Sequence, residues 1–158
     1  MPIEPVRFED VGECHFVGLR RTLKMDTAGE EIAAMWAAFS AAGPVEGQNS
    51  EYAYGIMPKD QPAEGSFDYM PAVGVSAFTE AHSGRDQLTI PAARYAVFWH
   101  GEHAMTAKTT WSAIFGEWQP QSGFDHDATP FLEVYDQRFD PATGEGGFEI
   151  WIPVKAKE

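Results

Sequence analysis

Residues 29–42, GEEIAAMWAAFSAA, and residues 104–118, AMTAKTTWSAIFGEW, are the two stretches that decide the fold. In the first, large apolar side chains recur three, four and seven positions apart, so they share one face of a helix. The second stretch repeats this spacing 79 positions later (111−32). The matched side chains are Ile32, Met35, Trp36 and Phe39, then Trp111, Ile114, Phe115 and Trp118. A period of half the chain length indicates an internal duplication.

Extended segments flank both helices in the same order. Residues 5–23 and 86–100 precede them, and the pairs 51–57 with 67–75 and 130–138 with 147–155 follow them. Helices followed by antiparallel pairs favour an α+β fold with the helices on one side of a sheet. We therefore expect two tandem β-α-β-β modules related by pseudo-two-fold symmetry, with a curved antiparallel sheet and a central cleft. The expected single domain is 1–158, with repeat one at about 1–76, a linker at about 77–85 and repeat two at about 86–156.

The composition narrows the classes of partner. A net charge of −13 on 158 residues disfavours direct contact with nucleic-acid phosphates. The single cysteine, Cys14, and the absence of a signal-peptide pattern predict a reducing, cytoplasmic setting. No segment is long and apolar enough to predict a membrane span. The sequence has no phosphate loop, dinucleotide fingerprint or complete Cys/His set, so we expect neither a cofactor nor a metal.

The second half resembles a known family in the order and spacing of its motifs. These are Ile90-Pro91-Ala92, Tyr95 to Phe98, Trp111 to Trp118, Ser122-Gly123, Phe131 to Asp136 and Ile150 to Lys155. The family is the GyrI-like, or effector-binding, family. Its members occur behind DNA-binding helices in multidrug-sensing regulators and also as separate domains. The resemblance implies the duplicated fold and a small-molecule ligand.

Glu133 falls on the glutamate of the family motif, and its neighbours explain why it matters. Phe131, Glu133 and Tyr135 alternate with Leu132 and Val134, so both faces of this strand are largely apolar and the strand should be central. A carboxylate there loses solvation, which costs several kcal/mol unless a partner compensates it. An organic cation could be that partner, and aromatic neighbours would add cation–π attraction. A solvated glutamate at a strand edge is the alternative.

Other aromatic residues are candidates for the same ligand pocket. The resemblance implies that Trp151 contributes to it, although core packing is an alternative. By repeat symmetry Tyr52 and Tyr54 would occupy the strand equivalent to 133–135 (133−81 gives 52) and line the opposite wall. Trp99 stands where the family would have a smaller polar residue, and it would narrow or cap the cleft. Trp36, Trp111 and Trp118 fit packing between helix and sheet.

Three functions follow from this pattern. The leading one is binding of lipophilic aromatic, cationic compounds through Glu133, as in the effector domains of multidrug-sensing regulators. The second, also a property of some family members, is hydrolysis of cyclopropane-bearing genotoxins, with Glu133 as the catalytic group. The third is an acidic inhibitor of a protein such as a topoisomerase. The sequence does not decide between binding and catalysis.

Overall fold

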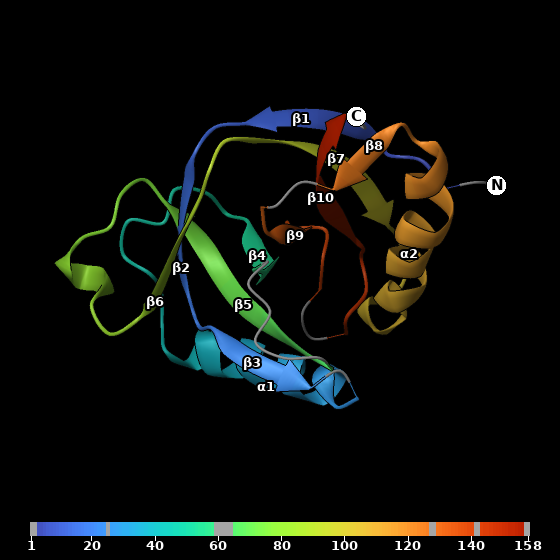
Figure 1. Cartoon of the computed structure of the whole chain (residues 1–158). Helices are drawn as coiled ribbons and strands as arrows, with labels where there is room; N and C mark the ends of the chain where they lie inside the picture. Colours follow the sequence, from blue (N-terminus) through green and yellow to red (C-terminus); the bar gives the residue numbers. More distant parts are fainter. Residues whose placement is uncertain (1–2, 25, 59–64, 127–128, 141–142, 157–158) are drawn as a thin grey trace.

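We describe a computed structural model that covers residues 3–24, 26–58, 65–126, 129–140 and 143–156. Figure 1 shows a strongly curved sheet with helices against one side of it. The strands of the first half are β1 (Arg7–Val11), β2 (Cys14–Gly18), β3 (Arg21–Lys24), β4 (Ala53–Met57) and β5 (Ser66–Val75). Those of the second half are β6 (Asp86–Ile90), β7 (Ala93–His100), β8 (Phe124–His126), β9 (Phe131–Tyr135) and β10 (Phe148–Ala156).

The strand order carries the duplication. Along the sheet the order is β1-β7-β10-β9-β4-β5-β2-β6, with β3 on β5 and β8 on β10. Exchanging each of β1, β2, β4 and β5 for β6, β7, β9 and β10 reproduces this order in reverse. That is the relation expected of a two-fold axis between β4 and β9. The pseudo-two-fold symmetry predicted from the sequence is confirmed.

The two repeats also exchange their first strands. β1 pairs with β7 of the other repeat, and β6 pairs with β2. Val11 lies opposite Ala93 and Cys14 lies opposite Ile90, so the connections 11–14 and 90–93 run antiparallel beside each other. Figure 1 shows both connections crossing from one end of the sheet to the other. The ends of the sheet are thereby joined across its open face.

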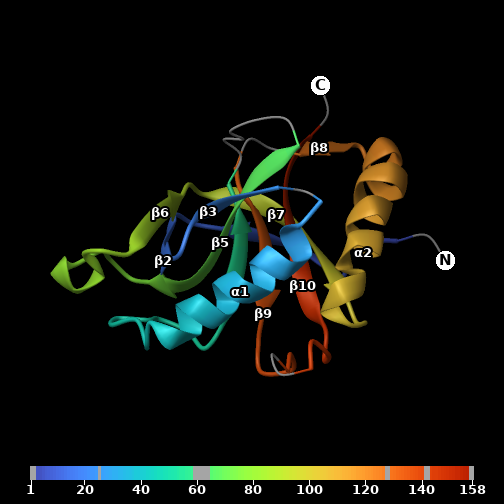
Figure 2. The same cartoon turned by 90° about the horizontal axis from the view of Figure 1, so that it is seen from below.

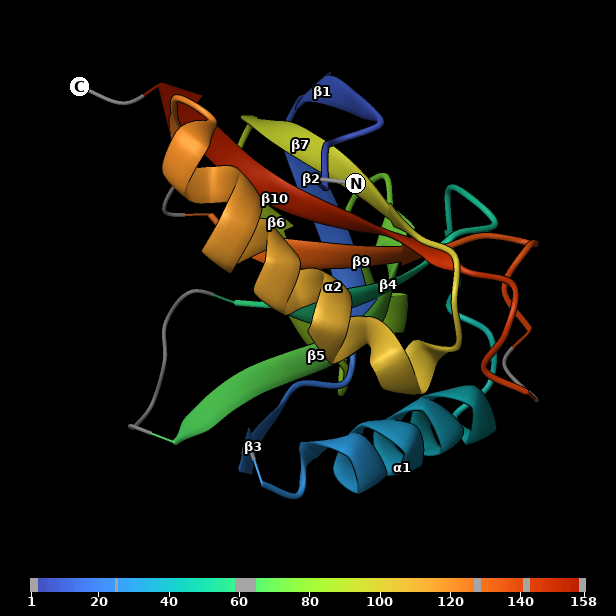
Figure 3. The ribbon, with the colours of Figure 1, turned by 90° about the vertical axis from the view of Figure 1, so that its right-hand side faces the viewer.

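Both helical regions pack on the other face, as predicted (Figures 2 and 3). The first is α1 (Ala28–Ala41). The second is one run of turns over the expected range: a 3₁₀ turn η2 (Ala104–Thr106), α2 (Ala107–Ala113) and a π turn η3 (Ile114–Trp118). Short 3₁₀ turns η1 (Glu80–His82) and η4 (Gln119–Gln121) lie in the linker and after η3. Among the described residues, no helix is both long and apolar enough to cross a membrane.

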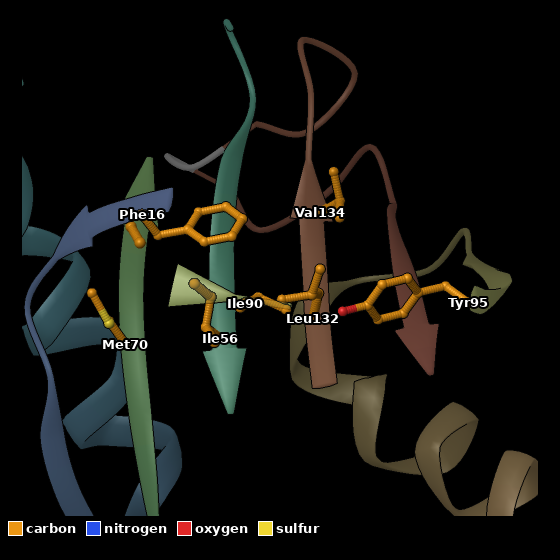
Figure 4. Close-up of a cluster of buried hydrophobic side chains, with 8 residues drawn as sticks. Phe16, Ile56, Met70, Ile90, Tyr95, Leu132 and Val134 are labelled. Carbon is orange, nitrogen blue, oxygen red and sulfur yellow. The ribbon is translucent and has the colours of Figure 1, made fainter. Parts of the chain in front are cut away.

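The sheet separates two sets of core side chains. On the helix face, one cluster around Phe98, Ile114 and Ile150 packs under α2, and another around Leu23, Met35 and Tyr69 packs under α1. On the open face, Phe16, Ile56, Met70, Ile90, Tyr95, Leu132 and Val134 form a separate cluster (Figure 4). The alternation of side chains along each strand therefore decides whether a side chain packs on the helix face or on the open face.

Candidate functional site

Glu133 sits at the centre of the sheet, on the face that the helices cover. Strand β9 lies between β10 and β4, and Glu133 faces Ile150 on one neighbour and Gly55 on the other. Its side chain is only 9% exposed. The sequence prediction of a central strand with a buried carboxylate agrees with this arrangement.

Three neutral donors hold the carboxylate. The Tyr135 hydroxyl donates to Oε1 over 2.8 Å and the Tyr69 hydroxyl donates to the same oxygen over 3.2 Å. The indole N–H of Trp111 donates to Oε2 over 3.2 Å. Hydrogen bonds to a charged acceptor are worth about 1.5–3 kcal/mol each, so this set offsets part of the desolvation cost.

The same network reaches both helices. Trp111 lies on α2, so its bond ties the second helix to Glu133 directly. On α1, the indole N–H of Trp36 donates to the Tyr69 hydroxyl over 3.1 Å, and the Trp36 ring meets the Tyr135 ring edge-on at 5.5 Å. One buried carboxylate therefore links the two helices across the pseudo-symmetry axis.

Burial dominates the electrostatics of Glu133. Desolvation raises the pKa of this carboxyl, and the hydrogen bonds from Tyr135, Trp111 and Tyr69 lower it by less. Desolvation also raises the pKa values of Tyr69 and Tyr135 well above their usual range, and the nearby Glu133 charge adds to that. The tyrosines therefore stay protonated as donors, while the carboxyl binds a proton more readily than it would in water.

Glu133 is closely packed on the side of strand β4. Gly55 lies opposite it on β4, and a Cβ at this position would overlap the Tyr69 hydroxyl and lie 2.9 Å from Glu133 Oε1. Tyr69 therefore fills the β4 side of the carboxylate, and the Trp111 indole of α2 lies against its other oxygen.

An open pocket of about 530 Å³ lies on the other face of the sheet. Leu132 and Val134, the neighbours of Glu133 along β9, form part of its floor together with Phe16 and Ile90 (Figure 4). Its rim carries charged side chains from β1, β10 and the turn after β9, among them Arg7, Glu149 and Arg138. This pocket and Glu133 are on opposite sides of one sheet layer.

The sequence-predicted site residues divide between the two faces. Glu133 and Tyr135 meet on the helix face. Trp151 pairs with Leu132 and Tyr54 pairs with Val134, so both point to the open pocket, and Tyr52 lines its edge. The expectation of one pocket holding all of them is corrected.

Trp99 pairs with Glu149 and so lies on the open face, but outside the pocket. It is 37% exposed and lies under the Arg138 guanidinium at 4.3 Å.

The repeat offset explains why the tyrosines are on the other face. The bounds of β4 and β9 differ by 78 residues (131−53), whereas the sequence alignment of the repeats used 81. By these bounds the counterpart of Glu133 is Gly55, not Tyr52. An odd error in a strand offset moves every side chain to the opposite face of the sheet.

The comparisons with known proteins decide the family. The model of the GyrI-like small molecule binding domain matches residues 4–155. The chain belongs to the GyrI-like family. A curated relative, the transcriptional regulator BrlR of Pseudomonas aeruginosa, is 28% identical over 129 residues, which are 80% of this chain and 47% of BrlR. The chain therefore spans about half the length of that regulator.

Solved structures share the fold of this domain. The structure of SAV2435 bound to tetraphenylphosphonium has a TM-score of 0.76 at 20% identity and covers 94% of this chain and 93% of that one. The C-terminal domain of EcmrR has a TM-score of 0.68 at 14% identity and covers 96% and 97% of the two chains. At these identities the likeness shows the fold alone.

Sequence reasoning did not find all the residues around the carboxylate of this GyrI-like domain. Tyr69 was not a candidate, because only the register between β4 and β5 brings its hydroxyl to Glu133. Trp36 and Trp111, which the sequence predicts to pack between helix and sheet, also donate into the network. Among the described residues, no group of His, Cys, Asp and Glu has the arrangement of a metal site.

Removing the shortest hydrogen bond should move the pKa of Glu133 upward. In Tyr135→Phe the carboxylate loses a hydrogen-bond donor that lowers its pKa, while the desolvation that raises the pKa remains. The protonated form of Glu133 therefore becomes more stable relative to the charged form. The measurement is a pH titration of the Glu133 carboxyl carbon by NMR on selectively labelled protein. A pKa that stays the same or falls would contradict the assigned role of this hydroxyl.

Proposed function

We propose that this GyrI-like domain binds lipophilic aromatic cations, and that Glu133 is the counter-ion, between the sheet and the two helices. The observation that carries the proposal is the charge balance of the site. Glu133 is buried, and its three hydrogen-bond donors are neutral. A charge in such surroundings remains costly, so a cation placed against it recovers free energy that neutral donors do not supply.

The chemistry of the surrounding side chains defines the ligand class. Tyr69, Tyr135, Trp36 and Trp111 present aromatic rings next to the carboxylate. Ring faces attract a cation by about 0.5–2 kcal/mol each, more strongly when water is excluded. A strongly hydrated small cation would lose its water shell here, whereas a delocalised charge on an apolar body loses little. The site therefore favours bulky organic cations.

Entry of the ligand requires the helices to move and to break their hydrogen bonds to the network. Trp111 and Trp36 are the connections from α2 and α1 to the network, and each donates a single hydrogen bond. Breaking a bond of this kind costs about 1 kcal/mol, or up to about 3 kcal/mol where the acceptor is charged. A cation that replaces the indole donors can offset this cost. Binding would thus shift the two helices relative to the sheet.

Known proteins of this fold support the proposal. The structure with the TM-score of 0.76 contains tetraphenylphosphonium, a lipophilic aromatic cation. BrlR is a transcriptional regulator. EcmrR has been solved in a complex with DNA, and this chain covers 57% of the EcmrR chain in that complex. No regulatory role is proposed for this chain, since it spans only part of those regulators.

The test is thermal unfolding and calorimetry with tetraphenylphosphonium. At a concentration one hundred times Kd, binding adds about 2.7 kcal/mol of stability. That corresponds to a rise in Tm of roughly 5–10 °C for a domain of this size. Glu133→Gln should abolish the rise, while Glu117→Gln, an exposed acid on the helix run, should retain it. If Glu133→Gln binds the cation as tightly as wild type, or wild type does not bind any of a panel of such cations, the proposal is wrong.

Hydrolysis is the second candidate, and the raised pKa of Glu133 favours it. A carboxyl that holds its proton nearer to neutral pH is a better general acid. The discriminating experiment is to incubate the protein with a reactive cyclopropane compound and follow product by mass spectrometry. A compound that is bound and recovered intact leaves binding as the function, and product that disappears in Glu133→Gln establishes catalysis.

A further inference from the structure

The open pocket lies inside the ring that the exchanged strands close. Its floor comes from the central strands through Leu132 and Val134, and its far wall comes from the crossing connections through Val11, Cys14 and Pro91. Since residues 11 and 14 pair with 93 and 90, the wall is part of the hydrogen-bonded ladder rather than a separate loop. The cavity therefore exists without any rearrangement.

Aromatic rings line this pocket from two sides. Trp151 packs against Tyr95 with ring centroids 5.6 Å apart, and Tyr54 meets Phe16 edge-on at 4.9 Å. Tyr52 is 44% exposed, next to Tyr54 at 6.5 Å, where it extends the aromatic surface toward the mouth. Flat apolar surfaces of this kind suit a planar ring system. A volume of about 530 Å³ is within the range for drug-sized ligands.

The rim of the pocket carries more carboxylates than guanidiniums. Arg7 makes a bidentate pair with Glu149, at 2.8 and 3.0 Å, and Arg138 pairs with Asp136 at 2.6 Å. Arg7 also pairs with Glu9, whose Oε1 lies 3.4 Å from the guanidinium Nε. Glu9 lies on the same face of β1 as Arg7, so the carboxylates of Glu9, Asp136 and Glu149 outnumber the two guanidiniums at the pocket. This surplus attracts a positively charged group and repels an anion.

The Trp151 side chain is fixed by the same rim. Its indole N–H donates to Glu149 Oε1 over 3.1 Å, and the Arg7 guanidinium lies 5.6 Å from its ring centroid. A ring held in this way presents one face without losing further rotamer freedom on binding. Such preorganisation lowers the entropic cost of holding a ligand.

The pocket is independent of Glu133. The carboxylate faces the helices, whereas its strand neighbours Leu132 and Val134 face the pocket, so the sheet layer lies between the two sites. Lipophilic cations at Glu133 need a change of side-chain positions. A ligand in the open pocket needs none.

We propose that this pocket is a second ligand site, which binds a planar aromatic amine with its ring on Trp151 and Tyr54 and its protonated nitrogen at the Glu9 side of the rim. The two faces of the sheet then bind two ligands at once. The open site is sensitive to salt, because its rim charges are exposed to solvent. The site at Glu133 depends much less on salt.

The experiment uses 9-aminoacridine as the probe and isothermal calorimetry as the readout, with the Glu133→Gln variant as the protein. Binding should persist in this variant with one molecule per chain, and tetraphenylphosphonium should not displace it from wild type. Trp151→Leu should weaken binding about tenfold, which is the size expected for loss of one stacked aromatic. Tyr52→Ala, at an exposed position that does not endanger folding, should weaken it several-fold. Glu117→Gln should leave it unchanged.

Two outcomes overturn the proposal. One is absence of 9-aminoacridine binding to both wild type and Glu133→Gln. The other is binding that is lost in Glu133→Gln and kept in Tyr52→Ala and Trp151→Leu, which would place the amine at the carboxylate. The indole N–H resonance of Trp151 in a ¹⁵N spectrum gives a second readout, and it should shift on titration while that of Trp111 should not. Failure of tetraphenylphosphonium to bind would affect only the function proposed for Glu133.

Discussion

Gly55→Ala should destabilise the domain by about 3 kcal/mol and abolish binding of aromatic cations at Glu133. Gly55 pairs with Glu133 across the central strands, and a methyl group there would overlap the Tyr69 hydroxyl. Tyr69 is only 1% exposed, and overpacking a buried position of this kind costs about 1–3 kcal/mol. The displaced hydroxyl also stops donating to Glu133, which adds the cost of a lost hydrogen bond to a charged acceptor. Chemical denaturation measures the first effect and calorimetry measures the second.

Gly29→Ala is the matched control. It makes the same chemical change within α1, where a Cβ meets nothing within 4 Å. Alanine favours a helix over glycine by about 0.5–1 kcal/mol, so this variant should be slightly more stable and should bind as wild type does. Equal stability of Gly55→Ala and wild type would show that the Tyr69–Glu133 contact is loose, and the closed description of the site would then be wrong.

The fold could be predicted from the sequence because it depends on periodic patterns. The spacing of apolar residues in 29–42 and 104–118 is repeated, and each helix is followed by two strands, so the duplication and the side on which the helices lie both follow. The exchange of β1 and β6 between the repeats could not be predicted in this way. It depends on which edges pair, and pairing between distant strands leaves no local pattern in the sequence.

The candidate site was predictable only in part, and the limit is the face of each strand. Alternation placed Glu133 and Tyr135 together, and they are together. Alternation also placed Trp151 and Ile150 on different faces of their strand, but the sequence does not say which of these two side chains lies on the same face as Glu133. The register shows that Ile150 pairs with Glu133, and Trp151 therefore faces the open pocket. The sequence places Tyr54 on the wrong face because two offsets relate the repeats. The sequences of the final strands match at an offset of 81 residues (148−67), whereas β4 and β9 match at 78.

Glu133→Gln should become more stable relative to wild type as the pH rises. Desolvation raises the folded-state pKa of Glu133, so its contribution to stability is fully present below the unfolded-state pKa and is lost as the pH rises through the folded value. Between these two pKa values wild type should lose up to about 1.4 kcal/mol per pH unit relative to the variant, which has no proton to release. Tyr69, Tyr135 and His100 are the titratable neighbours that influence this pKa. Urea unfolding of both proteins from pH 4 to pH 8 measures the difference and stays below the range in which the tyrosines titrate.

Glu149→Gln, on the other face of the same sheet, should change the pH dependence of stability in the opposite direction. Desolvation raises the pKa of Glu149, but the hydrogen bonds from Arg7 and Trp151 and the charges of Arg7 and Arg138 together lower it below its usual value. Its contribution to stability is therefore present above the unfolded-state pKa and is lost as the pH falls through the folded value. Wild type should thus gain stability relative to Glu149→Gln as the pH rises in the acid range, whereas it loses stability relative to Glu133→Gln. If wild type gained stability relative to Glu133→Gln as well when the pH rises, Glu133 would not carry the desolvation that makes it a counter-ion for a ligand.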